Sequence, residues 1–458
     1  MRDRMTTAWR TLAVAAIAVF MVSLDSTVLF VAFPSIRATF SEVSSEGISW
    51  ILNVYTLGYG ALLVPTGRLA DRFGRRRFFL AGIAVFTLAS LLCGVAPNVP
   101  LLIAARGMQS VGAALLMPAS LALVLHAFPT ERRGVAIGIW GAVGALAAAI
   151  GPAAGSAIVQ FATWRWVFLL NLPLGAYALL IGRQRVRESQ ASEQGGLPDA
   201  IGIVLLVASF GVMAYGIIGA REKPSIAPAA VLLGLALLAL FVLRSLRVAV
   251  PALDVRLFRR RTFAIANAMT LVFGIAFTAM FFGNVLFLTE RWHLSIFEAG
   301  VWISPGPLTV IPVAILAGRR ADRTGYRRPF VAGGLLFAMS AAWMLHVANG
   351  GASFLLWLPP SIAAGSAVGF VLPSLSGAAA LDLDAATFGA GSGVNQAIRQ
   401  FGSVLGVAVV VLLVGRPGET PPFERVFAFL LIGGLLTTIG GLAMPAPPVR
   451  LEAEGGAP

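Results

Sequence analysis

Charged residues are scarce in this chain. Asp, Glu, Lys and Arg make up 12% of its 458 residues, whereas 58% of them are hydrophobic. Soluble domains average roughly 25% charged residues, so water cannot be the main solvent of this protein. Its single cysteine, Cys93, excludes a disulfide framework and a metal site built from cysteines. Strand patterns of period two are also lacking, which predicts an all-α membrane protein and not a β-barrel.

Long apolar runs take the place of the missing charge. A helix needs about 20 mainly apolar residues to cross a bilayer. Runs of this kind, bounded by charge clusters and Pro/Gly breaks, predict fourteen spans near residues 11–34, 48–66, 78–96, 100–125, 134–160, 165–182, 199–219, 226–246, 263–289, 297–317, 329–348, 353–380, 387–414 and 426–444. The first run has no small-residue cleavage site and many runs follow it, so it is predicted to stay as a span.

The net charge of +14 is concentrated in short arginine clusters between the apolar runs. Such clusters orient membrane proteins, because cytoplasmic loops carry an excess of Lys and Arg. With the N-terminus in the cytoplasm and fourteen crossings, cytoplasmic segments hold 25 of the 34 basic residues and outer loops hold seven. We therefore expect a multi-pass protein of the bacterial cytoplasmic membrane with both termini in the cytoplasm. We expect no nucleic-acid partner.

An internal repeat divides the chain. The segment GRLADRFGRRR at 67–77 returns as GRRADRTGYRR at 318–328. Once the seventh and eighth spans are set aside, six spans belong to each repeat. The predicted organisation is an N-terminal six-helix bundle at 1–190, a two-helix insert with its linkers at 191–261, and a C-terminal six-helix bundle at 262–458.

Several stretches, taken in order, resemble the major facilitator superfamily and its fourteen-span drug:proton antiporter branch. They are LDSTVLFVAFP at 24–34, the loop segment at 67–77, LIAARGMQSVGAA around Arg106, the pattern Gly138, Gly151, Pro152 and Gly155, WRWVFLLNLPLG at 164–175, and GSGVNQAIRQFGSVLGVA at 391–408. Ser110, Ala147 and Ser156 stand where the family has glycines, and Phe30 stands where Asn is frequent. The resemblance implies a major facilitator fold, a substrate site between the halves near the membrane midplane, and a monomer.

Asp25 is the single acidic residue well inside a predicted span. A carboxylate at that depth costs several kcal/mol unless it is neutralised or paired. Burial disfavours its charged form and a nearby cation favours it, so its protonation can respond to the conformation around it. A proton-coupled exporter requires such a group. The alternative is a structural carboxylate that Ser23, Ser26 or Thr27 caps.

Arg106 and Arg399 are the basic residues within spans. Arg106 could pair with Asp25 or hold an anionic or carbonyl-bearing ligand, and the resemblance places it near the cavity and in proton transfer. Alternatively, Arg106 bonds backbone carbonyls and fixes helix packing, while Arg399 reaches towards an interface. The candidates for lining the cavity are Asn53, Gln109, Asn395 and Arg399.

The two repeated loops are candidates for a cytoplasmic gate. Their glycines permit tight turns, and Asp71 can pair with arginines or cap a neighbouring helix and so tie the halves together. The alternative is that the arginines only set the topology. The candidate gate residues are Gly67, Asp71, Arg72, Gly74, Arg75, Gly318, Asp322 and Arg323.

In the fifth span, Gly151-Pro152 removes a backbone hydrogen bond and predicts a bend, and Gly138 and Gly155 let a partner helix come close. By resemblance this bend is typical of antiporters and seals against proton leak. Ordinary small-residue packing is the alternative.

Other patterns are less specific. A ninth-span stripe could line a drug pocket or could face lipid or a neighbouring helix: Phe273, Phe277, Phe281 and Phe282. The histidines lie at span ends without metal-ligand spacing, and neither a phosphate loop nor a nucleophile–base arrangement is found. We therefore expect no enzyme, no cofactor and no metal.

The sequence thus predicts proton-driven export of small amphipathic compounds such as drugs or natural products. In this interpretation Asp25 carries the proton and Arg106 tunes it. A proton symporter that imports a nutrient is the alternative within transport. A membrane receptor or scaffold that has lost transport is the alternative from another class.

Overall fold

The computed structural model describes residues 2–129, 132–188, 199–220, 223–348, 350–381, 383, 388–414 and 422–444. Within these ranges, fourteen helical segments are long and apolar enough to cross a membrane. Each of them coincides with one of the spans predicted from the sequence. The prediction of an all-α membrane protein with fourteen spans is therefore confirmed.

The first six spans are formed by seven helices. Polar caps set where two of them begin. The Ser44 side chain accepts a hydrogen bond from the backbone N–H of Gly47, and the Asn98 side chain accepts one from the backbone N–H of Leu101. The helices are α1 (Arg2–Thr39), α2 (Ser45–Phe73), α3 (Arg75–Gly94), α4 (Val99–Ala127), α5 (Arg133–Phe161), and the pair α6 (Arg165–Leu169) and α7 (Asn171–Arg185), which share one span.

The other eight spans follow the same pattern, with one more divided span. Pro305 lacks a backbone N–H and begins a new helix there. The helices are α8 (Ala200–Ile218), α9 (Ala227–Arg247), α10 (Arg261–Leu286) with the π-helical turn η3 (Phe287–Arg291), the pair α11 (Ile296–Ile303) and α12 (Pro305–Thr324), α13 (Arg327–Val347), α14 (Phe354–Ala380), α15 (Phe388–Val414) and α16 (Phe423–Ala443).

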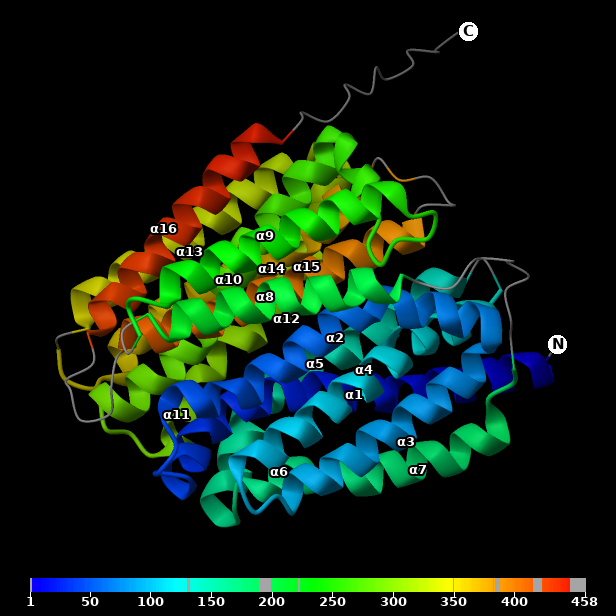
Figure 1. The fold of residues 1–458 in the computed structure, drawn as a ribbon, viewed down its shortest axis with the longest axis horizontal. Helices are drawn as coiled ribbons and strands as arrows, with labels where there is room; N and C mark the ends of the chain where they lie inside the picture. The colour runs from blue at the N-terminus through cyan, green and yellow to red at the C-terminus, as the bar shows by residue number, and fades with distance from the viewer. Residues whose placement is uncertain are drawn as a thin grey trace, which may run out of the picture.

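The helices lie side by side in one elongated bundle (Figure 1). Helices α1 to α7 occupy the lower part of that view, and α13 and α16 lie along its upper edge. The two groups meet where α2 packs against α15, where α5 packs against α11, and where α1 packs against α10. Helices α8 and α9 pack on each other, and α8 also contacts both α2 and α15. The insert therefore covers one of the seams between the groups.

An ion pair holds the two insert helices together at one end. Asp199 precedes α8, and both of its carboxylate oxygens accept hydrogen bonds from Arg244 in the last turn of α9, at 2.8–3.0 Å. The Asp199 side chain is 3% exposed and that of Arg244 is 33% exposed. The hydrogen-bonded guanidinium holds the pKa of Asp199 below its usual value.

The repeated loops form the same kind of turn in both halves. Gly74 lies between α2 and α3 with φ 115°, and Gly325 lies between α12 and α13 with φ 73°. Residues with a side chain rarely adopt this backbone region, so both turns need glycine. The α2–α3 loop lies at the end of the bundle where α1 begins, and we call this the arginine-rich end because Arg75, Arg76 and Arg77 lie there.

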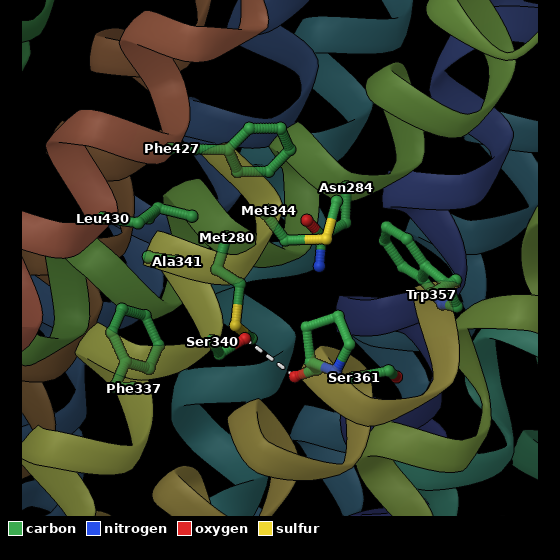
Figure 2. A pocket seen from close by; sticks show the side chains of 11 residues that line it. Met280, Asn284, Phe337, Ser340, Ala341, Met344, Trp357, Ser361, Phe427 and Leu430 are labelled. Atoms are coloured by element: carbon green, nitrogen blue, oxygen red, sulfur yellow. Dashed lines mark hydrogen bonds between the residues drawn. The ribbon is translucent and has the colours of Figure 1, made fainter. Parts of the chain in front are cut away.

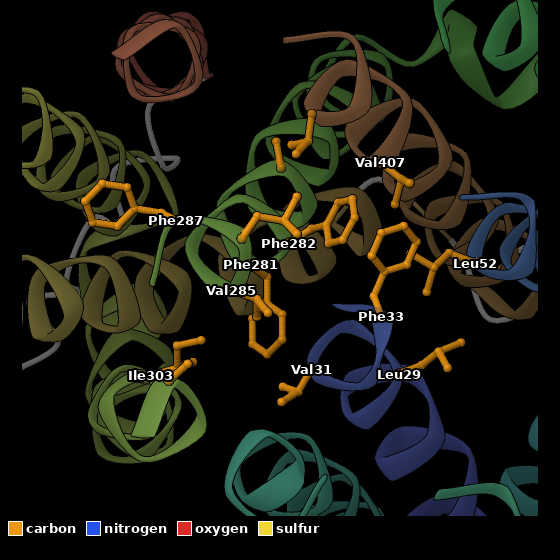
Figure 3. Packing of buried hydrophobic residues seen from close by; sticks show 14 of the residues in the cluster. Leu29, Val31, Phe33, Leu52, Phe281, Phe282, Val285, Phe287, Ile303 and Val407 are labelled. Atoms are coloured by element: carbon orange, nitrogen blue, oxygen red, sulfur yellow. The ribbon is translucent and has the colours of Figure 1, made fainter. Parts of the chain in front are cut away.

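A layer of phenylalanine rings joins α1 to α10 (Figure 3). Phe30 lies 5.5 Å from Phe281 between ring centroids, and Phe33 lies 4.8 Å from Phe282 in an edge-to-face arrangement. Such pairs stabilise packing by about 0.5–1.5 kcal/mol each beyond the area they bury. The ninth-span stripe thus packs against a neighbouring helix, which is one of the two interpretations that the sequence left open.

Candidate functional site

The centre of the N-terminal helices holds a buried ion pair. The Arg106 guanidinium of α4 donates from Nη1 to Oδ2 of Asp25 on α1 at 2.7 Å. Asp25 is 2% exposed and Arg106 is 1% exposed. The pair lies inside two membrane-spanning helices, where unpaired charges are costly. Of the options that the sequence left for Arg106, pairing with Asp25 is the one observed.

Gln109 completes this pair one turn along α4. Its amide donates to Oδ1 of Asp25 at 2.9 Å and to the Ser90 hydroxyl at 2.9 Å, and its oxygen accepts from Arg106 at 2.6 Å. Asn171 at the start of α7 also donates to Ser90, at 3.3 Å. The cluster of Asp25, Arg106, Gln109, Ser90 and Asn171 therefore joins four spans by hydrogen bonds, and we call it the polar cluster.

Two of the three hydroxyls near Asp25, those of Ser26 and Thr27, do not cap it. Ser26 donates to the carbonyl of Val22 at 2.8 Å, and Thr27 donates to the carbonyl of Leu24 at 3.2 Å. Their donors are thus used within α1. The carboxylate accepts hydrogen bonds from a guanidinium and an amide of α4 instead.

Aromatic rings cover the guanidinium of Arg106. Its central carbon lies 4.0 Å from the ring centroid of Tyr55 and 5.7 Å from that of Phe168. Its Nε donates to the carbonyl of Ile51 on α2 at 3.2 Å. Cation–π contacts of this kind favour the charge by roughly 0.5–2 kcal/mol. Arg106 therefore has partners other than Asp25.

The fifth-span pattern packs against the part of α1 that carries Asp25. A side chain on Gly151 would collide with Thr27, and one on Gly155 would come within 2.6 Å of Val28. Helix α5 runs through Pro152 from Arg133 to Phe161. Gly138 belongs to α5, and its surroundings lie outside the described part of the chain.

Helix α11 of the C-terminal half meets the same pattern. A side chain on Gly300 would come within 2.7 Å of the Pro152 carbonyl and would collide with Ser156. Gly300 was not among the residues that the sequence singled out. The pattern around Gly151 therefore lies between Asp25 on one side and the other half of the protein on the other.

The first repeated loop has contacts within its own half and one contact outside it. Asp71 accepts from Arg75 at 2.6 Å, one helical turn away. Arg76 donates to the Arg183 carbonyl at 2.7 Å, and Arg68 donates to the Pro251 carbonyl at 3.0 Å. Asp71 is thus paired locally, and Arg68 reaches the segment between the insert and α10.

The other candidate gate residues have diverse surroundings. Arg72 lies 5.4 Å from the ring of Phe73, and Gly67 lies against Pro118 on α4. A β-carbon added to Gly318 would meet no atom of another described segment within 4 Å. The side chains of Asp322 and Arg323 lie outside the described part of the chain.

The four candidate cavity residues have different surroundings. The Asn395 amide donates to Asn267 at 3.1 Å and to Thr270 at 2.8 Å, so it ties α15 to α10. Asn53 on α2 is fully buried, and neither of its amide atoms has a hydrogen-bond partner among the described residues. Gln109 belongs to the polar cluster. Arg399 lies near the middle of α15 and interacts with Tyr59 of α2.

An ion pair crosses between the halves at the end away from the arginine-rich end. Arg37 near the end of α1 donates to Glu290 in η3 at 2.6 Å, and both side chains are partly exposed. It lies beyond the phenylalanine layer of Figure 3 along both helices. The sequence could not single out this pair, because the two residues belong to separate helical segments 253 positions apart.

Two spaces differ in what they could hold. A small cavity among α10, α13, α14 and α16 is lined by Met280, Met344 and Asn284, and beside it the Ser340 hydroxyl donates to the Pro360 carbonyl (Figure 2). Its free space is about 10 Å³, no more than one water needs. A groove of about 440 Å³ lies between α2, α4 and α8, and its lining is apolar, with Trp50, Val111 and Val207 among its residues.

Fourteen membrane-spanning segments in the described part of the chain, with a buried ion pair among the N-terminal helices, are typical of a polytopic membrane transporter. The chain belongs to the major facilitator superfamily, whose profile matches residues 15–407. The family predicted from the sequence and the expectation of a transporter and not an enzyme are both confirmed.

Curated relatives cover most of the chain. The multidrug resistance protein Stp of Mycobacterium tuberculosis is 34% identical over 407 residues, which cover 87% of this chain and 74% of Stp. The tetracenomycin C resistance and export protein of Streptomyces glaucescens is 31% identical and covers 90% of this chain and 77% of its own length. The methylenomycin A resistance protein of Bacillus subtilis is 32% identical, and the match covers 92% of this chain and 91% of that protein.

A solved structure shares the fold. The nucleoside transporter NupG superposes with a TM-score of 0.68, and the match covers 96% of this chain and 99% of NupG. The sequences are 12% identical, so this likeness concerns the fold alone.

Proposed function

We propose that this chain exports small amphipathic drugs or natural products across the bacterial cytoplasmic membrane in exchange for protons. The efflux part is borne out by relatives that are named for multidrug resistance and for antibiotic export. Proton coupling, the site residues, a monomeric state and the cytoplasmic location of both termini are parts of the proposal.

The observation that carries the proton coupling is the buried pair of Asp25 and Arg106, 2.7 Å apart. When Asp25 takes a proton, its attraction to Arg106 weakens, and Arg106 keeps the carbonyl of Ile51 and the ring of Tyr55 as partners. When Asp25 loses the proton, the ion pair re-forms. Protonation thereby changes the contacts between α1 and α4, and such a change can bias one conformation of the protein over another.

The two six-helix bundles, at 1–190 and 262–458, are the parts that move relative to each other in this proposal. The contact of α5 with α11 and the phenylalanine layer between α1 and α10 hold the halves together away from the arginine-rich end. The repeated loops gate the cytoplasmic side. The close fit of Gly151 and Gly155 against α1 keeps water from reaching Asp25 along α5.

Dye accumulation in an efflux-deficient bacterial host tests the proposal. The wild type, Asp25→Asn and an uncoupler control are compared with Glu42→Gln, which removes an exposed carboxylate outside the site. We expect the wild type and Glu42→Gln to lower accumulation, and Asp25→Asn and the uncoupler to abolish that effect. Raised accumulation with the wild type would instead favour import.

A further inference from the structure

Arg399 is a charged residue deep in the membrane region without an acidic partner among the described residues. It is the twelfth of the 27 residues of α15, so its backbone lies roughly 16 Å from the nearer helix end. An arginine side chain cannot span that distance to reach the interface. No described carboxylate lies within ion-pair distance of its guanidinium.

The side chain faces the seam between the two halves. Arg399 and Gln396 of α15 interact with Tyr59 of α2. The same helices meet one residue further along, where a side chain on Gly60 would come within 2.8 Å of the Cβ of Gln400. Arg399 is half-buried, so part of its surface remains accessible within the protein.

Two stacked tyrosine rings connect Arg399 to the polar cluster. Tyr59 lies 6.1 Å from Tyr55 between ring centroids at an interplanar angle of 29°, and Tyr55 covers Arg106. Both tyrosines are buried on one face of α2. The order along this face is thus the Asp25–Arg106 pair, two phenol rings, and the guanidinium of Arg399.

The charges of this region do not cancel. Asp25 and Arg106 sum to zero, and Arg399 adds one positive charge. The other buried carboxylate of the described chain, Asp199, lies at the end of α8 and is paired with Arg244. A half-buried guanidinium deep in the membrane region without a counter-charge is costly, and a ligand that brings a negative group relieves that cost.

We propose that Arg399, with Tyr59 beside it, binds the anionic group of an aromatic substrate, a carboxylate or a phenolate. The guanidinium offers a planar fork of donors that matches a carboxylate. The Tyr59 ring, which interacts with Arg399, can contact the edge of an aromatic system that carries this group. This assignment names the substrate class of the export function proposed above and rests on it.

Equilibrium binding to the purified full-length protein in detergent tests the assignment. The probes are aromatic carboxylic acids and their methyl esters, with 1-pyrenecarboxylic acid and its methyl ester, which carries no phenol, as the fluorescent pair. A hydrogen-bonded ion pair predicts that the wild type binds the acids about tenfold or more tightly than the esters. We expect Arg399→Gln to remove this preference while leaving ester binding unchanged, Arg399→Lys to keep part of it, and Arg247→Gln, an exposed control, to keep all of it.

Two results would overturn the assignment: no acid binds the wild type more tightly than its ester, or Arg399→Gln weakens acids and esters equally. Transport of an ester in liposomes under a pH gradient separates this inference from the proposed function. If an ester is transported under the gradient but binding shows no preference for the acid, the anion subsite alone is refuted. If binding shows a preference for the acid but no probe is transported under the gradient, the subsite is supported and proton-coupled export is refuted.

Discussion

Replacing Asp25 by Asn removes the negative member of the buried pair and leaves Arg106 charged in a site that is 1% exposed. The new amide can still accept one hydrogen bond, but its nitrogen adds donors opposite the donors of Arg106 and Gln109. Asp25→Asn is therefore expected both to destabilise the fold and to stop the response of transport to a pH gradient.

The size of the effect follows from the contacts. Removing one partner of a buried ion pair costs about 3–5 kcal/mol. The Tyr55 ring, 4.0 Å from the guanidinium, offsets roughly 0.5–2 kcal/mol of this. We expect a net loss of roughly 1–4.5 kcal/mol. Arg106→Gln should cost less, about 1–3 kcal/mol, because the remaining carboxylate can take up a proton whereas a guanidinium cannot lose one.

Two assays separate stability from coupling. Denaturant unfolding in detergent measures the free energy of unfolding for both single variants and for the double variant, whose loss should be smaller than the sum of the two. Liposomes then measure dye uptake under a pH gradient and dye exchange without one. The Asp25→Asn variant should keep exchange and lose the gradient response, while Glu42→Gln should keep both.

Gradient-driven uptake at the wild-type rate by a folded Asp25→Asn variant would refute the role given to this carboxylate. Additive losses of stability in the double variant would show that the pair contributes no mutual stabilisation, contrary to its geometry.

Three further predictions concern helix packing and loops. Gly74→Ala should destabilise the α2–α3 turn by about 1–3 kcal/mol because its φ is 115°, whereas Gly141→Ala, with open space around it, should be neutral or stabilising in thermal melts. Gly300→Leu should lower the stability by about 1–3 kcal/mol and should also lower transport, because α11 can no longer approach α5. A variant that melts and takes up substrate like the wild type would contradict this. Because folding lowers the pKa of Asp199, its charged carboxylate stabilises the insert at pH values above the pKa of the unfolded state. This contribution is lost as the pH falls through the lowered pKa of the folded state. Asp199→Asn should therefore flatten the acid side of the stability–pH profile, and an unchanged profile would show that the bond to Arg244 adds nothing.

The spans could be predicted because apolar runs report directly on the length that a bilayer requires. Charge clusters then separated them, and every predicted span overlaps a helix. Asp25 and Arg106 stood out for the same reason, since charge inside an apolar run is rare. Their pairing was one option among several, because the 81 positions between them say nothing about which helix faces meet.

The rest of the polar cluster could not be predicted from the sequence. Ser90 and Asn171 are small polar residues in apolar runs, and such residues often bond only to their own helix. Gln109 was proposed for the cavity, and its position one turn after Arg106 is the signal that could have placed it with the pair. Gly300 gave no signal at all, because its importance comes from Pro152 and Ser156 on a distant helix.

The phenylalanine layer between α1 and α10 has a consequence for how transport depends on temperature. If the halves separate at this end during each cycle, rings such as Phe33 and Phe282 leave a dry environment. Exposure of apolar surface raises the heat capacity, so the free-energy difference between the closed and the open form curves with temperature. The population of the open form then falls less steeply on cooling than a fixed enthalpy would require, and the Arrhenius plot of the transport rate bends.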